Sequence, residues 1–410
     1  MNEITYNSKY KILLFLIVFT PWLEPYKYSG VDLDTLALLS TILFSWVTFG
    51  NKWNLNYKSK PFLLYGLIVP TTISIIYGLD SNIKSSFITL FLYTFFTAQI
   101  SNNISSKYFI KYYRILVYIA ILVFAIQELM YMSVGYRFSA LIPFFDLKYD
   151  FTTMQVYITK QMFYPRSSSV FLEPSHFAQY ILPYFAYTLS KNTNVISIKR
   201  WLEPAILLLV FFFLRSGCGV VCSIAIIVAY VLIVRINAFR KILIISSAIV
   251  LFPVIFNRIV ATEAGEQLLT RTSELEAGGD YDRSGTQRIF RGFYVYSSED
   301  FPLQLFGVGT GGTIDVINTS SAKVMFNSNE RYLNNIHTLL IGFGLIGSML
   351  FFLYLFTLFK CSEMDGRLIL VGFLTLCFME SFFLNSKMIL YFAFVYALLR
   401  KHRCSIIGNS

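Results

Sequence analysis

Charge is what this sequence has least of: only 14% of its 410 residues are Asp, Glu, Lys or Arg. A soluble globular domain averages about 25% charged residues, whereas 56% of this chain is hydrophobic. So few charges cannot keep that much Phe, Ile and Leu in water. The composition therefore excludes a water-soluble enzyme, a nucleic-acid-binding protein and a disordered scaffold, and it predicts a protein of the lipid bilayer.

Cysteine is also scarce. The sequence has 5 cysteines, Cys218, Cys222, Cys361, Cys377 and Cys404, and all fall in apolar runs or in loops that we expect on the cytoplasmic side. Without cysteines in the long polar segments, no disulfide framework is implied. Cys218 and Cys222 lie four residues apart on one helical face, as a pair of metal ligands would. Because no third ligand is near them in the sequence, we interpret them as small apolar packing residues.

Long apolar runs fill most of the chain. A helix needs roughly 20 residues to cross a bilayer, and about twelve runs approach that length; because some are short or adjacent, about ten or eleven spans is the alternative. They lie at 10–24, 33–49, 61–79, 85–100, 109–133, 174–190, 201–215, 217–234, 240–257, 337–359, 366–383 and 385–399. The first run ends in Pro21–Glu24 and not in a small-residue cleavage site, so we expect no cleavable signal peptide. The pattern predicts an all-α, polytopic integral membrane helix bundle, a single domain over residues 1–410.

The basic residues are unevenly distributed over the loops between these runs. If the N-terminus is cytoplasmic, most Lys and Arg of the short loops fall on the inner side, which is the bias found in membrane proteins. Most Asp and Glu then fall on the outer side. The net charge of +11 is explained by anchoring in the membrane and not by contact with nucleic acid. We predict cytoplasmic termini and two outer loops, a medium one at 135–173 and a large one at 258–336.

The large outer loop carries much of the polar chemistry. It opens with a predicted amphipathic helix at Thr262–Glu276. A second predicted helix follows, on which Arg288 and Arg291 project from one face because they lie three residues apart. Residues 301–312 form a predicted glycine-rich turn, which lacks the Lys-Ser/Thr ending of a nucleotide-binding loop. The chain then re-enters the membrane at His337, near the outer boundary.

The medium outer loop brings further polar residues to the same boundary. It contains Arg166, and it ends in Glu173 and Pro174, where the proline suits the first turn of the next span. A short turn between two later spans adds Arg215. Each residue has a simpler explanation: the arginines can contact lipid headgroups, and Glu173 can favour the positive end of a helix dipole. Arg215 is harder to explain in this way, because it interrupts an otherwise apolar hairpin.

A set of short motifs, in this order, resembles the O-antigen polymerase (Wzy) and O-antigen ligase superfamily. The motifs are Arg166 with Phe171–Pro174, Leu214–Gly217, Ser284–Arg288, Phe306–Gly309 and His337–Gly347. The topological similarity covers nearly the whole chain, and the motif matches lie within 166–347. The resemblance implies transfer of a glycan from undecaprenyl diphosphate at the periplasmic face of a bacterial inner membrane. The Arg166 and Glu-Pro motif looks more like the polymerases, so we expect a polysaccharide polymerase.

The resemblance also implies roles for individual residues. Arginines at the outer face of the superfamily hold the pyrophosphate, and Arg215 and Arg288 match their positions, although the Leu-Arg-Ser-Gly order departs from the commoner Ser-Arg-Gly. His337 matches a histidine proposed as the base in the ligases. Beyond the lipid-linked oligosaccharide and membrane lipid, we expect a chain-length regulator protein as a partner.

These roles agree with the chemistry of the side chains. Guanidinium groups form paired hydrogen bonds to phosphate oxygens and stabilise the charge on a diphosphate leaving group. We therefore predict that Arg166, Arg215, Arg288 and Arg291 bind the diphosphate. The acceptor sugar hydroxyl needs a base, and Glu173 or His337 is predicted to supply it. Because the arginines already supply positive charge, we expect no metal and no other cofactor.

Three alternatives stay open. An O-antigen ligase would transfer the glycan to lipid A core instead of to a second lipid-linked repeat unit. A metal-dependent glycosyltransferase using a polyprenyl monophosphate sugar would need an outer Asp-x-Asp, and Asp32–Asp34 and Asp280–Asp282 fit that pattern. A transporter of lipid-linked oligosaccharide would show ionisable residues near the bilayer midplane or repeated broken helices.

Overall fold

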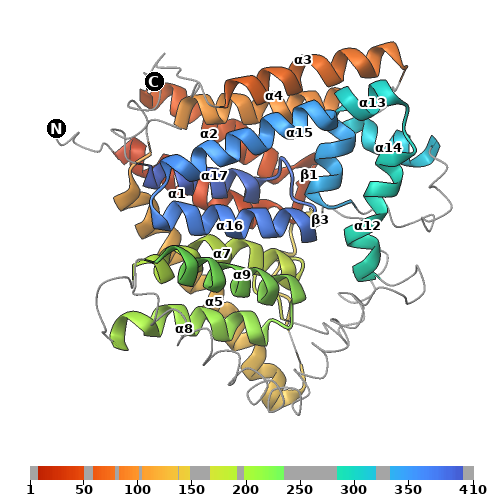
Figure 1. The fold of residues 1–410 in the computed structure, drawn as a ribbon. Coiled ribbons are helices and arrows are strands. Elements are labelled where there is room, and N and C mark those ends of the chain that lie inside the picture. The colour runs from red at the N-terminus through yellow and green to blue at the C-terminus, as the bar shows by residue number, and fades with distance from the viewer. Residues whose placement is uncertain are drawn as a thin grey trace.

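Figure 1 shows a largely helical molecule. The computed structural model describes residues 8–49, 59–78, 83–100, 104–136, 138–147, 167–191, 198–234, 284–319 and 333–399. Its helices are α1 Ser8–Phe19, η1 Thr20–Leu23 (a 3-10 turn), α2 Leu33–Phe49, α3 Lys60–Ile76, α4 Ile83–Ile100, α5 Ser106–Val134, α7 Pro174–Ser190, α8 Ile198–Phe213, α9 Gly217–Ile233, α12 Ser284–Ser297, α13 Phe301–Phe306, α14 Gly309–Thr319, α15 Asn335–Cys361, α16 Met364–Met379 and α17 Ser386–Leu398. The helical fold class is confirmed at this level.

Each predicted apolar run within the described residues contains a helix, whereas the run at 240–257 and the predicted helix at Thr262–Glu276 lie outside them. Two of the described helices, α5 and α15, are long and apolar enough to cross a membrane. The other apolar helices are shorter, because turns or a proline in the first helical turn limit their length. Helix α7, for example, begins at Pro174, whose missing N–H costs nothing in the first turn.

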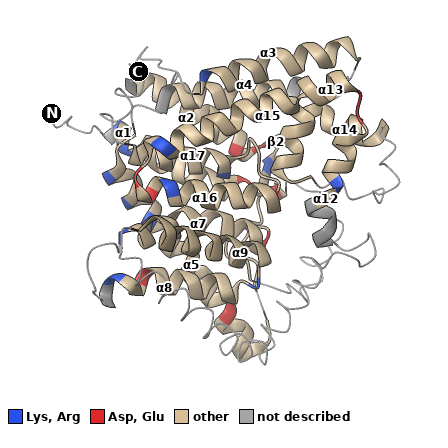
Figure 2. Ribbon diagram, in the orientation of Figure 1, with Lys and Arg blue, Asp and Glu red and all other residues tan. Residues whose placement is uncertain are grey.

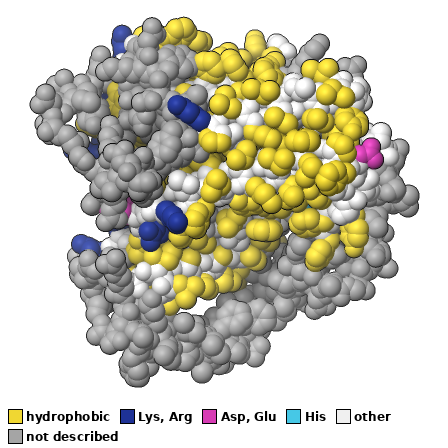
Figure 3. Space-filling model, turned by 45° about the horizontal axis from the view of Figure 1, so that its top comes forward, with side chains coloured by type: hydrophobic (Ala, Val, Ile, Leu, Met, Phe, Trp, Pro, Cys, Tyr) yellow, Lys and Arg dark blue, Asp and Glu magenta, His cyan; other side chains and the backbone are white. Residues whose placement is uncertain are grey.

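The surface of the molecule is rich in large apolar side chains. Figure 3 shows a face covered by hydrophobic groups, with Lys and Arg near one edge. Ile68 and Ile75 of α3 and Met349 and Leu353 of α15 are among the exposed residues. Contiguous apolar surface of this kind marks contact with a membrane or another protein. Together with the length of α5 and α15, it indicates membrane association.

The basic residues of the described chain gather mainly at one end of the bundle, where α1 begins (Figure 2). Lys11 of α1, Lys107 at the start of α5 and Lys360 at the end of α15 each lie over an aromatic ring, at 5.5, 6.0 and 4.4 Å from its centroid. Cation–π contacts let these long side chains cover apolar surface while their charged ends stay in water.

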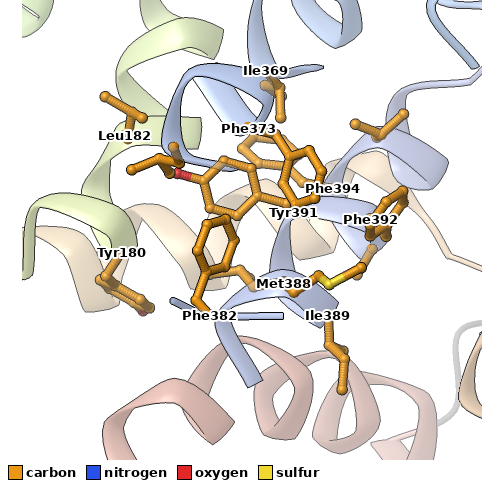
Figure 4. Packing of buried hydrophobic residues seen from close by; sticks show 14 of the residues in the cluster. Tyr180, Leu182, Ile369, Phe373, Phe382, Met388, Ile389, Tyr391, Phe392 and Phe394 are labelled. Carbon is orange, nitrogen blue, oxygen red and sulfur yellow. The ribbon is translucent and has the colours of Figure 1, made fainter. Parts of the chain in front are cut away.

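The core is built from aromatic rings around α17. Phe373 of α16 packs against Tyr391 and Phe392 of α17 at centroid distances of 5.7 and 5.2 Å, and against Phe382 at 5.5 Å (Figure 4). Helix α17 is buried from Ser386 to Ala397. Because rings lose little conformational entropy on burial and cover a large area, they fill the centre of such a bundle efficiently.

One small sheet departs from an all-α fold. Its antiparallel strands are β1 Tyr26–Tyr28, β2 Val31–Asp32 and β3 Asp146–Leu147, in the order β2-β1-β3. The hydroxyl of Tyr26 accepts a hydrogen bond from the Ile142 N–H at 2.9 Å. The sheet thus joins the loop after η1 to the segment predicted as the medium outer loop.

The predicted glycine-rich turn at 301–312 is wrong. This segment forms α13 and the start of α14, with only Gly307 and Val308 between them. Gly307 adopts a left-handed φ of 77°, which ends α13 without the steric cost of a Cβ. The motif is therefore a break between two helices and not an open loop that could surround a phosphate.

A second break in α15 meets the first. Gly344 has a φ of 64° inside α15, and a Cβ there would lie 2.3 Å from the carbonyl oxygen of Leu305. The Val308 N–H donates to the Ile341 carbonyl at 3.0 Å, and the Tyr65 hydroxyl donates to the Phe306 carbonyl at 3.0 Å. The break between α13 and α14 is therefore hydrogen-bonded to α15 through Val308 and to α3 through Phe306. These bonds satisfy backbone groups that no helix pairs, and they hold α13 and α14 against the bundle.

Candidate functional site

Helix α12 packs directly on His337. A Cβ at Gly292 would lie 2.1 Å from Cγ of His337 and 2.5 Å from its Nδ1, so only glycine allows this approach. The ring of Phe293 meets the imidazole edge-on, at a centroid distance of 4.8 Å and an angle of 86°. The start of α15 thus lies against the helix that carries Arg288 and Arg291.

Of the two arginines of α12, only Arg291 has a side chain among the described residues. Arg291 is 4% exposed and lies on the buried side of the helix with Gly292 and Val295. Arg288 lies one turn earlier in α12, and its side chain is outside the described residues, as is the whole of Arg166. Of α12, Gly292 and Phe293 are the residues whose contact with His337 is described.

His337 is held by the asparagine that precedes its helix. The Asn334 side-chain oxygen accepts the His337 N–H at 2.9 Å and caps α15. The same amide donates to the Phe378 carbonyl at 2.9 Å, at the end of α16. Asn335 adds a second tether, since its side-chain oxygen accepts the Phe382 N–H at 2.7 Å. The two asparagines therefore fix the start of α15 to the α16–α17 connection.

His337 is deeper than its place at a span boundary suggests. The sequence predicts it at the outer boundary of a span, and the structure adds that its side chain is 1% exposed beneath α12. The reason is a tertiary contact: the segment that covers it comes from a distant part of the chain. In this conformation the imidazole is not open to a substrate, so a role as base requires α12 to shift.

Arg215 lies at the start of the neighbouring helix α9. It sits in the turn after α8 with a φ of 52°, just before the Ser216 cap of α9. The Cys218 thiol, close by in the same helix, interacts with the carboxylate of Glu380 at the end of α16. Helix α16 contacts both α9 and α12. Arg215 thus precedes a helix that has α16 as a neighbour in common with α12.

Glu173 is the N-cap residue of α7 and is half-buried. Its side chain does not cap the helix; its Oε2 atom accepts the Ser175 hydroxyl at 3.2 Å. The carboxylate therefore lies at the positive end of the helix dipole and stays more accessible than His337. Helix α16 contacts both α7 and α15 and joins the two candidate bases through the bundle.

A buried amide fixes the loop that leads to Glu173. Gln127 of α5 accepts the Ser169 N–H at 2.9 Å and donates to the Ser169 carbonyl at 3.2 Å. Ser169 has a left-handed φ of 57°, a strained conformation for serine. Next to it, the Ser167 hydroxyl donates to the Glu128 carboxylate at 2.5 Å. The serines after Arg166 are thus anchors of the loop, a role that sequence reasoning did not assign.

Sequence reasoning also missed a buried ion pair. Lys387, at the start of α17, places its ammonium 2.9 Å from the carboxylate of Glu24, and both side chains are buried. The Asn385 amide donates to the other oxygen of Glu24 at 3.2 Å. A cation in the first turn of a helix is repelled by the positive end of the helix dipole. The position of Lys387 in the sequence could therefore have indicated that it needs an anionic partner.

The candidate metal ligands are spread over separate elements. Asp32 lies in β2, whereas Asp34 caps the Thr35 N–H in the first turn of α2; Asp280–Asp282 lies outside the described residues. Cys218 and Cys222 are buried and free, as expected of packing residues. Cys377 of α16 lies near Cys222, a neighbour that sequence distance hides. Within the described ranges, no group of three His, Cys, Asp or Glu is arranged to hold a metal ion.

One carboxyl group in the turn between α12 and α13 has a shifted pKa. Partial burial raises the pKa of Glu299 to about 7, and the charge of Asp300 adds to the effect. The turn itself is closed by Gln304, whose side-chain amide donates to the Glu299 carbonyl at 2.8 Å. The electrostatics of this end of α12 therefore change near neutral pH.

Comparison of the chain with family models and with curated proteins gave no match. What the site can do is therefore argued from its own residues.

Proposed function

We propose that the chain is a multi-pass polysaccharide polymerase of the bacterial inner membrane, with about twelve spans and a periplasmic active site. It transfers an undecaprenyl-diphosphate-linked glycan to a lipid-linked repeat unit. The single observation that carries the proposal is the packing of α12, which bears Arg288 and Arg291, on His337. It supports the proposal because the helix that carries these arginines, a residue type that binds phosphate, packs on a residue type that transfers protons.

The charge distribution supports the proposed orientation. The basic end of the bundle in Figure 2 is the end that the loop charges assign to the cytoplasm. His337 begins α15 and Lys360 ends it, so α12 lies at the opposite end of that helix from the basic residues. In the proposed topology this opposite end faces the periplasm, where lipid-linked repeat units are used.

The proposed mechanism divides the work between cations and a base. Arg288 and Arg215 bind the diphosphate and stabilise its charge as the glycosidic bond to the sugar breaks. The acceptor hydroxyl attacks the sugar carbon and passes its proton to a base. Glu173, half-buried at the positive end of α7, is the accessible candidate in this conformation. His337 becomes available when α12 moves, and Arg291 then carries the motion to the imidazole region.

The test is replacement of Arg288 in a strain that lacks the native protein. We expect Arg288→Ala to abolish long-chain polysaccharide in an electrophoretic ladder, with unchanged protein in the membrane fraction. Arg200→Ala is the matched control, because Arg200 lies exposed at the start of α8, at the opposite end of that helix from Arg215. A normal ladder from Arg288→Ala would remove the central role of this residue and with it the proposal.

An O-antigen ligase is the second candidate, because the capped and tethered His337 matches the ligase histidine position. The two activities differ in the acceptor. In lipopolysaccharide from a deletion strain, core with a single repeat indicates lost polymerisation, whereas bare core indicates lost ligation. Activity that survives EDTA would count against the metal-dependent glycosyltransferase, and repeat units accumulating unpolymerised on the outer leaflet would exclude the transporter.

A further inference from the structure

In α12, the side chains that the structure describes expose aromatic rings and bury an arginine. Its buried side carries Arg291, Gly292 and Val295. Its exposed side carries Phe290 and Tyr294, which lie four residues apart on one face and are 47% and 48% exposed. A helix on the surface of a soluble protein places such residues the other way round. The exposed aromatic face of α12, formed by residues 290, 293 and 294, therefore favours an apolar environment.

The position of α12 along α15 identifies that environment. Gly292 and Phe293 contact His337, in the first turn of α15. Farther along the same helix, Met349 and Leu353 are exposed apolar residues. If α15 spans the bilayer, as the proposed function requires, its first turn lies near the edge of the hydrocarbon region. Helix α12 is then at the depth of the lipid headgroups.

Aromatic side chains are favoured at that depth. Tyr is enriched where acyl chains meet headgroups, because its apolar ring and polar hydroxyl suit the two sides of the boundary. Phe is typical of the apolar face of helices that lie in this boundary. We propose that α12 is an interfacial helix whose exposed aromatic face is inserted into the headgroup–acyl boundary of the outer leaflet, while its buried side holds Arg291 against the protein. This inference rests on the membrane placement of α15 within the proposed function.

The proposal gives α12 a second role besides carrying arginines. A helix that lies along the boundary sits at the level of the lipid phosphates, so a lipid diphosphate reaches α12 by lateral diffusion without leaving the headgroup layer. The aromatic face sets the depth of α12 in the boundary, and the opposite face carries the side chains proposed for the chemistry. The bilayer is thus the proposed occupant of this surface. The experiment below distinguishes it from a second copy of the chain or another part of the same chain.

Spin labels at single cysteines test the depth of α12. The native Cys218, Cys222, Cys361 and Cys377 are buried and react slowly with the label, and Cys404 is replaced by Ser. Labels are placed by Phe290→Cys and Tyr294→Cys in protein reconstituted into phosphatidylethanolamine–phosphatidylglycerol vesicles. Power saturation compares collisions with oxygen, which concentrates in lipid, and with a water-soluble nickel chelate. Leu353→Cys on α15 is the lipid reference, and Lys111→Cys on the basic end of α5 is the aqueous reference.

We expect the α12 labels to collide more with oxygen than with nickel, at a shallower depth than the Leu353 label. Greater nickel accessibility at both positions, with a lipidic Leu353 label, overturns the inference and leaves the membrane placement of α15 intact. Low accessibility to both reagents shows a protein occupant and also overturns it. An aqueous Leu353 label contradicts the proposed topology itself, and the inference falls with it.

Discussion

Around Phe373 the bundle is held by rings from α15, α16 and α17, with centroid distances between 5.2 and 6.4 Å. The outer unit, α12 to α14, is held differently: at Gly307 and Gly344 backbone meets backbone, and at Gly292 backbone meets an imidazole. Ring packing tolerates changes of similar volume, usually below about 1.5 kcal/mol. A backbone contact does not tolerate even one methyl group. The outer unit is therefore the part of the molecule whose position is set most strictly by single residues.

The ion pair of Lys387 and Glu24 is buried within the apolar bundle. Its disruption is expected to lower the free energy of unfolding more than any other change proposed here. Lys387→Met leaves the Glu24 carboxylate buried without its cation, which costs about 3–5 kcal/mol. Thermal unfolding in detergent, followed by tryptophan fluorescence, measures the loss. The double variant Glu24→Leu with Lys387→Met should recover most of it, because no lone charge remains. A double variant as unstable as the single one would show that the pair acts through packing.

Gly344→Ala tests the contact between the two helix breaks. The new Cβ would lie 2.3 Å from the Leu305 carbonyl oxygen in a left-handed conformation, so we expect a cost of roughly 2–4 kcal/mol from strain and overpacking. Gly135→Ala is the matched control: its φ is also positive, at 71°, but nothing lies within 4 Å of its Cβ. Equal costs for the two variants, measured by thermal unfolding, would mean that strain alone matters and the close contact does not.

Gly292→Ala asks how strictly α12 is seated on His337. Its Cβ would overlap a side chain and not backbone, so we expect a smaller cost, about 1–3 kcal/mol. Hydrogen exchange should show loss of protection in α12 while α16 and α17 stay protected. Gly217→Ala, in α9 with open space around its Cβ, is the control. Unchanged protection of α12 in Gly292→Ala would contradict the close seating described above.

The smallest expected effect is the pH dependence of the α12–α13 turn. Glu299 has its pKa raised from 4.5 to about 7 in the folded protein. Its contribution to stability is therefore fully present below pH 4.5 and is lost as the pH rises through about 7. Protection factors for amides at Ser297–Gln304, corrected for intrinsic exchange, should fall between pH 5 and 8. Glu299→Gln should remove most of this change, and an unaltered slope in that variant would assign it to another group.

The helical elements were predictable because periodicity and apolar runs are local properties. The runs at 385–399 and 337–359 became α17 and most of α15, and Pro174 starts α7 as its backbone chemistry requires. The small sheet was not predictable, since strands of two or three residues carry no pattern of their own. Its partners, β1 and β3, are separated by more than a hundred residues.

For the candidate site, the sequence supplies residue types as predictions, and only the structure supplies contacts. The resemblance pointed to Arg288 and His337, and the described contact between α12 and His337 is made by Gly292 and Phe293. The depth of His337, the anchor at Gln127 and the partner of Lys387 each depend on a residue far away in the sequence. No local pattern encodes such contacts. The glycine motif at 306–309 misled for the same reason, because its partner is the break at Gly344.

Helix α17 has a consequence for biosynthesis. It lies in the middle of the bundle and is buried from Ser386 to Ala397, yet it follows all the other described helices in the chain. The surrounding helices are therefore all synthesised before their central element has been made. Until then they must pack more loosely around the place that α17 later fills. Final assembly of the bundle is thus an event that follows translation of the last helix and is not gradual growth from the first.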